Sequence, residues 1–112
     1  MAFNPIEGFQ TQLTAFLSNV STLMSLPAPM IAKIQAELPP GDFTVFAINA
    51  GTKFEYVQCT GVSGGQAVIT RGTEGTTAQA WAAGSTVRFL WTSVGILGLT
   101  NGGLGVPINL TG

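Results

Sequence analysis

The side chains that could take part in a chemical reaction are few in this sequence. It contains no histidine, a single cysteine (Cys59) and five carboxylates among 112 residues. Acid–base and nucleophilic catalysis require such groups to be held close together. Cys59 lies in a strand-like run, where a thiol usually packs as a small buried apolar side chain. The sequence therefore predicts no enzyme and no catalytic residue.

Two of the carboxylates are close in sequence to a cation. Glu55 follows Lys53 in a strand-like run, and Glu74 follows Arg71 in a glycine-rich turn. Ordinary ion pairing accounts for such neighbours. Because the sequence has no His/Cys cluster and no closely spaced acidic run, we expect no metal site, and nothing in it indicates a cofactor.

Charge is scarce along the whole chain. Only 8% of the residues are charged and 46% are hydrophobic, with a mean hydropathy of +0.41; soluble domains typically have about 25% charged residues. Either the domain is simply uncharged and rich in Ser, Thr and Gly, or partner chains cover much of its surface. We favour partner chains, identical or different, because the buried parts of interfaces are depleted in charge.

The composition also argues against two kinds of partner. With four cations and a net charge of −1, the chain has no basic stripe for a phosphate backbone, so we expect no direct nucleic-acid binding. Residues 9–26 are uncharged, but they contain too many Gln, Thr, Ser and Asn side chains to span a bilayer. We predict no membrane span.

The N-terminal segment, residues 1–40, has helical patterning. Asn4, Pro5 and Glu7 fit a helix start, and apolar residues then recur at spacings of three and four. We expect an amphipathic helix there, and a second short helix over about 30–38 that ends at Pro39. The apolar face could pack on the chain's own sheet or form a coiled-coil seam between subunits. The candidate assembly contacts on it are Phe9, Leu13, Phe16, Val20 and Leu23.

Residues 41–92 have the character of a β-rich module. Runs of β-branched and aromatic residues at 43–48, 54–60, 66–70 and 86–92 predict four strands. Short turn-forming stretches at 49–52 and 61–65 separate the first three and predict hairpins. The expected fold class is mainly β, a small antiparallel barrel or sandwich.

Residues 93–112 predict an extended C-terminal arm rich in glycine. Its apolar residues are too numerous for a soluble disordered linker. We therefore expect the arm to order against a neighbouring chain. The candidate contacts in it are Leu97, Leu99, Leu104, Ile108 and Leu110.

The most specific stretch lies between the last two predicted strands, where residues 71–81 read RGTEGTTAQAW. Residues 53–92, about a third of the chain, resemble a small β-rich module of tail-fibre and tail-associated proteins of tailed bacteriophages. Thr73 and Cys59 depart mildly from its pattern. The physical reading is a rigid structural loop in which Glu74 pairs with Arg71 or accepts backbone amides, and in which a buried Trp81 donates its indole N–H to a carbonyl. The predicted loop residues are Arg71, Gly72, Glu74, Gly75, Thr76, Thr77 and Trp81.

The resemblance implies a virion structural protein, made in the bacterial host cytoplasm, that acts by assembly. A tail, neck or collar, baseplate or short tail-fibre adaptor position is favoured, with a homotrimer expected by analogy with fibres and other tail or capsid proteins as partners. One alternative is a capsid decoration or cement protein. Another is a small receptor- or carbohydrate-binding module that uses Trp81, Trp91 and Tyr56 as an aromatic platform.

Overall fold

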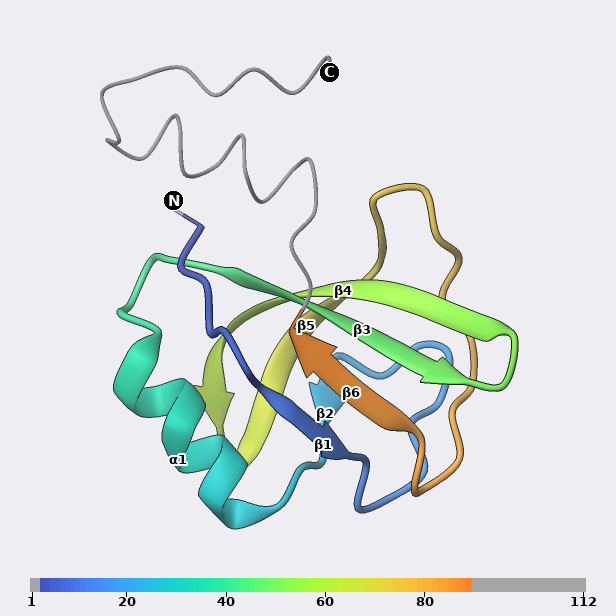
Figure 1. The fold of residues 1–112 in the computed structure, drawn as a ribbon, viewed down its shortest axis with the longest axis horizontal. Helices are drawn as coiled ribbons and strands as arrows, with labels where there is room; N and C mark the ends of the chain where they lie inside the picture. Colours follow the sequence, from blue (N-terminus) through green and yellow to red (C-terminus); the bar gives the residue numbers. More distant parts are fainter. Residues whose placement is uncertain (1–2, 90–112) are drawn as a thin grey trace.

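The computed structural model describes residues 3–89, which form one six-stranded sheet and one short helix (Figure 1). The predicted C-terminal arm, with Leu97, Leu99, Leu104, Ile108 and Leu110, lies outside the described residues. The elements in chain order are β1 (Gln10–Gln12), β2 (Leu23–Met24), α1 (Ala28–Glu37), β3 (Thr44–Ala50), β4 (Lys53–Ser63), β5 (Gln66–Thr73) and β6 (Thr86–Phe89).

The sheet curves into a half-barrel. Its strand order is β1-β6-β3-β4-β5-β2, and every pair of neighbouring strands is antiparallel. The mainly β fold class is therefore confirmed, and the barrel is open. The four predicted strands are also confirmed, within the described residues, as β3, β4, β5 and β6, and the predicted hairpins join β3 to β4 and β4 to β5.

The predicted N-terminal helix is wrong. Residues 10–12 instead pair with β6 and residues 23–24 pair with β5, so this segment supplies both outer strands of the sheet. The apolar spacing was ambiguous, because residues four apart lie on one side of an extended chain as well as on one face of a helix. Gly8, with a φ of +80°, and the many Ser, Thr and Asn residues disfavour a helix at this point.

The helix α1 agrees with the second predicted helix. Its side chains Ile31 and Ile34 are buried. On the helix, Lys33 pairs with Glu37 one turn away, with 2.7 Å between Nζ and the carboxylate oxygen. The helix packs against β4 and β5, and it ends just before Pro39 and Pro40, which cannot continue the backbone hydrogen bonding. Within residues 3–89, no helix has the length and apolar character needed to cross a membrane.

The main core fills the concave side of the half-barrel. Its central side chains come from alternate positions of β3 and β4, such as Phe46, Ile48 and Val57, and from Trp81 and Phe9. The rings of Phe9 and Phe46 stack at 4.5 Å. A smaller cluster covers part of the outer side of β3, so this strand is buried on both faces along most of its length. The smaller cluster consists of Phe3, Phe43 and Val45, flanked by Tyr56 and Phe89.

Candidate functional site

Among residues 3–89, a concentrated group of polar contacts surrounds the carboxylate of Glu55. This residue is in β4, faces the concave side of the sheet and is 0% exposed. Its two oxygens accept hydrogen bonds from five donors, each at 2.8–3.0 Å. The donors are Arg71 Nε, Arg71 Nη2, the Gly72 amide, the Gln79 amide and Trp81 Nε1.

Arg71 completes this group from β5. Besides its two bonds to Glu55, it donates to the carbonyls of Ser18, Ser21 and Gln79. A guanidinium has five N–H donors, and all five are used here. The side chain is only 7% exposed. Arg71 therefore joins three parts of the chain that are distant in sequence: strand β4, the loop after β5, and the N-terminal segment between β1 and β2.

The ionised form of Glu55 is the favoured one. Burial by itself raises the pKa of Glu55, but hydrogen bonds from Arg71, Trp81 and the amides of Gly72 and Gln79 outweigh burial and bring the pKa below its usual value. A carboxylate that has no solvent contact and five donors offers no free oxygen to a ligand. The arrangement serves as a crosslink within the fold. We call it the Glu55 network, meaning Glu55, Arg71, Trp81 and the amides of Gly72 and Gln79.

Trp81 is buried, as the sequence predicted. It is 1% exposed, and its backbone forms a two-way bridge with Leu17, with both N–H···O distances at 2.8 Å. Its indole N–H finds the Glu55 carboxylate at 2.9 Å instead of the predicted carbonyl. The ammonium group of Lys53 lies over the indole, 5.0 Å from the ring centroid. Trp81 is thus a structural plug that also orients the buried carboxylate.

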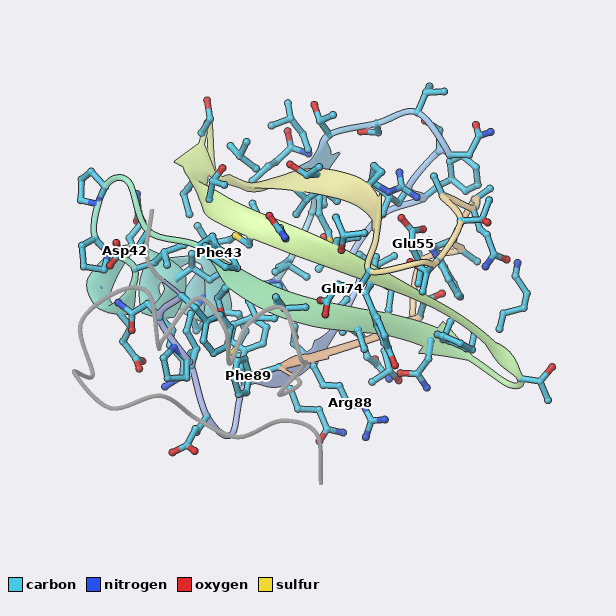
Figure 2. All side chains as sticks on the ribbon, turned by 90° about the horizontal axis from the view of Figure 1, so that it is seen from above. Asp42, Phe43, Glu55, Glu74, Arg88 and Phe89 are labelled. Carbon is cyan, nitrogen blue, oxygen red and sulfur yellow. The ribbon has the colours of Figure 1, made fainter. Side chains whose placement is uncertain are left out.

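The predicted pairing of Arg71 with Glu74 is wrong, because Arg71 pairs with Glu55. The side chains of Glu55 and Glu74 lie apart in Figure 2. Glu74 instead has a φ of +56° at the turn, and one of its carboxylate oxygens is buried without a hydrogen-bond partner. The partner was hard to identify because Arg71 and Glu55 are 16 residues apart. Their meeting depends on the register of β4 and β5, which shifts twice between Tyr56 and Gly61.

The rest of the predicted loop is held by its own hydrogen bonds. The Thr76 hydroxyl accepts from the Tyr56 amide at 3.0 Å and donates to the Thr73 carbonyl at 2.7 Å. Gly72 has a φ of +56°, and a Cβ at this position would lie 3.0 Å from the backbone nitrogen of Ala78. Thr77 and Gly75 are exposed. This close packing explains why the motif has a glycine at position 72.

Cys59 is a core residue. It is 0% exposed, and burial raises the pKa of its thiol to about 11. The thiol donates a hydrogen bond to the Gly61 carbonyl. The thiol is therefore protonated at neutral pH, and it packs as a small apolar side chain.

The predicted N-terminal contact residues divide into two groups. Phe9 and Leu13 are 2% exposed and lie in the core of the chain itself, so they are not available to a partner. Phe16, Val20 and Leu23 are exposed at 66%, 79% and 40%. These three, which we call the apolar loop patch, come from the segment that Arg71 holds through Ser18 and Ser21.

The aromatic platform predicted for a carbohydrate is not assembled from the described residues. Trp81 is buried, Trp91 lies outside the described residues, and Tyr56 is half-buried on the outer side of the sheet. Sequence reasoning missed Phe54, which is 51% exposed and contacts Tyr56 with ring centroids 5.5 Å apart. The alternation of Phe54, Glu55 and Tyr56 along a strand was the signal that could have placed the two rings together.

Comparisons of the sequence with protein-family models and with curated proteins give no match.

Proposed function

We propose that the protein is a structural subunit of a tailed-bacteriophage particle, at a tail, neck, baseplate or short-fibre position, and that it acts by assembly. The resemblance of residues 53–92 motivates the virion context. The observation that carries the assembly role is the apolar loop patch, three exposed apolar side chains presented by a segment that is held in place.

The patch lies in a part of the chain without charge. Residues 8–32 contain no Asp, Glu, Lys or Arg, while Phe16 and Val20 are largely exposed. Charge depletion with exposed aromatic and aliphatic side chains is typical of the centre of a protein interface. A neutral patch can also meet another neutral surface without like-charge repulsion.

The geometry favours binding through a preorganised loop. The Ser18 and Ser21 carbonyls accept hydrogen bonds from Arg71, and the Ser18 hydroxyl accepts from the amides of Val20 and Ser21. Ordering a loop before binding lowers the entropic cost of association. In this proposal the Glu55 network supports assembly indirectly, because it holds the segment that carries the apolar loop patch.

The test is a double substitution, Phe16→Ser with Val20→Ser. We expect it to leave the thermal unfolding transition within a few degrees of the parent value, because both side chains are exposed, and to abolish self-association in sedimentation and incorporation into particles in a complementation assay. The matched control is Phe54→Ser, which removes an exposed apolar side chain from another surface and should leave both readouts unchanged. Normal incorporation of the double variant would contradict the proposed role of the patch. Absence of the parent protein from purified particles would contradict the virion context.

A further inference from the structure

The four cations of the chain differ in whether they have an acidic partner. Lys33 pairs with Glu37, and Arg71 pairs with Glu55. Among the described residues, Lys53 and Arg88 have no carboxylate in ion-pairing contact. Both line the same pocket, of about 300 Å³, on the outer side of the sheet. The ammonium of Lys53 lies over the Trp81 ring, so Arg88 is the cation that the pocket offers to a ligand. In a chain with so little charge, an exposed arginine at a pocket, without an acidic partner among the described residues, indicates a site for an anion.

The register of the sheet places this pocket opposite the Glu55 network. Ala47 in β3 lies between Tyr56 in β4 and Arg88 in β6, and these cross-strand neighbours face the same side. The alanine is small, which leaves a hollow between its two larger neighbours. Arg88 and Glu55 lie on opposite sides of β3 and β4 (Figure 2). The pocket is lined by Ala47, Asn49, Gly51, Thr52, Lys53, Phe54, Tyr56 and Arg88.

A second pocket, of about 310 Å³, lies next to the first. The two share Thr52, Lys53 and Phe54, so the exposed Phe54 lines both. The second pocket has a different lining, without Arg88. Its other residues are Gly75, Thr76, Thr77 and Gln79. Gln79 donates its side-chain amide to the Phe54 carbonyl, which leaves its amide oxygen available as an acceptor.

We propose that these two pockets form a binding groove for an acidic oligosaccharide, with a carboxylated sugar in the pocket that contains Arg88 and a neutral sugar in the pocket that contains Thr77 and Gln79. The guanidinium of Arg88 has the planar fork that matches a carboxylate. The exposed ring of Phe54 offers an apolar face to the C–H groups of a sugar. Hydroxyl and amide groups in the second pocket suit sugar hydroxyls.

The observations favour a sugar over the other anionic ligands. A nucleic acid would require several cations along a groove, because its affinity comes from many phosphate contacts. The cations that line this groove are Arg88 and Lys53, and the ammonium of Lys53 lies over Trp81. The surrounding side chains are mostly neutral hydrogen-bonding groups beside one exposed ring. The inference goes beyond the assembly role and does not rest on it.

Strand β4, which carries Phe54 and Tyr56, is fixed by hydrogen bonds on the concave side of the sheet. Phe54 and Tyr56 flank Glu55, which accepts five hydrogen bonds on the concave side. The Tyr56 amide and carbonyl are bonded to the hydroxyls of Thr76 and Thr73. A rigid backbone at these positions keeps the two pockets in a constant relation to each other, which is what a two-sugar ligand needs.

The experiment is an NMR titration of the ¹⁵N-labelled full chain with a disaccharide of glucuronic acid and glucose. The matched probe is the neutral disaccharide in which glucose replaces glucuronic acid. We expect the acidic disaccharide to shift the amide signals of residues 51–56 and 75–79 and of Arg88, and to bind about tenfold or more tightly than the neutral probe. Shifts confined to other parts of the sheet, or equal affinity for both probes, would overturn the proposal. Tighter binding of glucose 6-phosphate than of glucuronic acid would overturn the assignment of a carboxylated sugar.

Three variants locate the interaction. Arg88→Gln should weaken binding of the acidic disaccharide about tenfold and bring it to the level of the neutral probe, whereas Phe54→Ala should weaken both probes. Lys33→Gln is the control, since it removes a cation that lies on the helix and has its own partner, and it should bind as the parent does. Unchanged binding of Arg88→Gln would overturn the site. Because Phe16 and Val20 are not part of the groove, the double variant of the assembly test should bind the disaccharide normally, which keeps the two proposals separable.

Discussion

The two sides of residues 54–56 use polar groups in opposite ways. On the concave side, Glu55 is fully buried and accepts five hydrogen bonds. On the outer side, Phe54 is half-exposed and lines the same pocket as Arg88, which has no acidic partner among the described residues. The two faces of the sheet therefore differ, because the charge of Glu55 is completely satisfied and the charge of Arg88 is available to a ligand.

The difference follows from what each side requires of a charge. A buried ion pair is tolerated only when hydrogen bonds replace the lost water, and removing one member leaves the other uncompensated. An exposed cation keeps its hydration and needs no partner in the protein. The concave side should therefore govern folding, and the outer side should govern binding. Each prediction below changes one side and measures both properties.

The largest effect is expected from Glu55→Gln. The amide of glutamine would place a donor against the donors of Arg71 and the backbone, and it would leave the guanidinium buried without a counter-charge. We expect the free energy of unfolding to fall by about 3–5 kcal/mol. Chemical denaturation measures this change in the free energy of unfolding. Glu37→Gln, which removes the acid of an exposed pair, is the control, with an expected loss of about 0.5 kcal/mol or less.

Substitutions of Trp81 separate its volume from its hydrogen bond. Trp81→Ala should destabilise the protein by about 3–5 kcal/mol because it opens a cavity in the core. Trp81→Phe keeps much of the apolar contact but leaves one Glu55 oxygen short of a donor, and it should cost about 1–3 kcal/mol. A negligible loss for Trp81→Phe in denaturation experiments would show that the indole N–H contributes nothing, and equal losses for the two variants would show that the ring volume contributes nothing.

Gly72→Ala tests the packing of the loop on the network. The positive φ and the 3.0 Å approach of an added Cβ to the Ala78 nitrogen predict strain in the folded state. A loss of about 1–3 kcal/mol is expected in thermal or chemical unfolding. Gly64→Ala has a similar φ but no atom within 4 Å of the added Cβ, so it reports the backbone strain alone and should lose less.

The smallest effect on stability belongs to the outer side. Arg88→Gln and Phe54→Ala should each change the free energy of unfolding by about 0.5 kcal/mol or less, because both side chains are exposed and, within residues 3–89, no side-chain hydrogen bond joins them to the core. The same variants are expected to weaken binding of the acidic disaccharide. A variant that is clearly less stable but binds the disaccharide as the parent does would contradict the assignment of the two sides.

The sequence predicted the strands well because alternation of apolar and polar residues is a local signal. Trp81 was correctly placed in the core, and α1 was found between prolines at both ends. The N-terminal segment was misread, since Phe9, Leu13 and Leu17 are spaced for either a helix or an extended chain. Only the contact of this segment with β5 and β6 decides between the two, and that contact joins residues more than 40 positions apart.

The partner of Arg71 and the outer groove were missed for a related reason. Glu74 is three residues from Arg71, whereas Glu55 reaches it only through the register of β4 and β5. The groove needs three strands in register before Ala47, Tyr56 and Arg88 become neighbours. Sequence spacing identifies groups that could interact locally, but it does not identify which strands pair.

The pKa of Glu55 is the most direct test that the concave charge is fully satisfied. It can be measured from the side-chain carboxyl carbon by NMR as the pH is lowered. We predict a value below the usual 4.5, so the ionised form should stabilise the fold above pH 4.5 and the stabilisation should disappear as the pH falls through the lower value of the folded protein. Glu55→Gln should lack this part of the pH dependence of stability. A pKa above 4.5 would mean that burial outweighs the hydrogen bonds, and it would contradict the description of Glu55 as a satisfied structural charge.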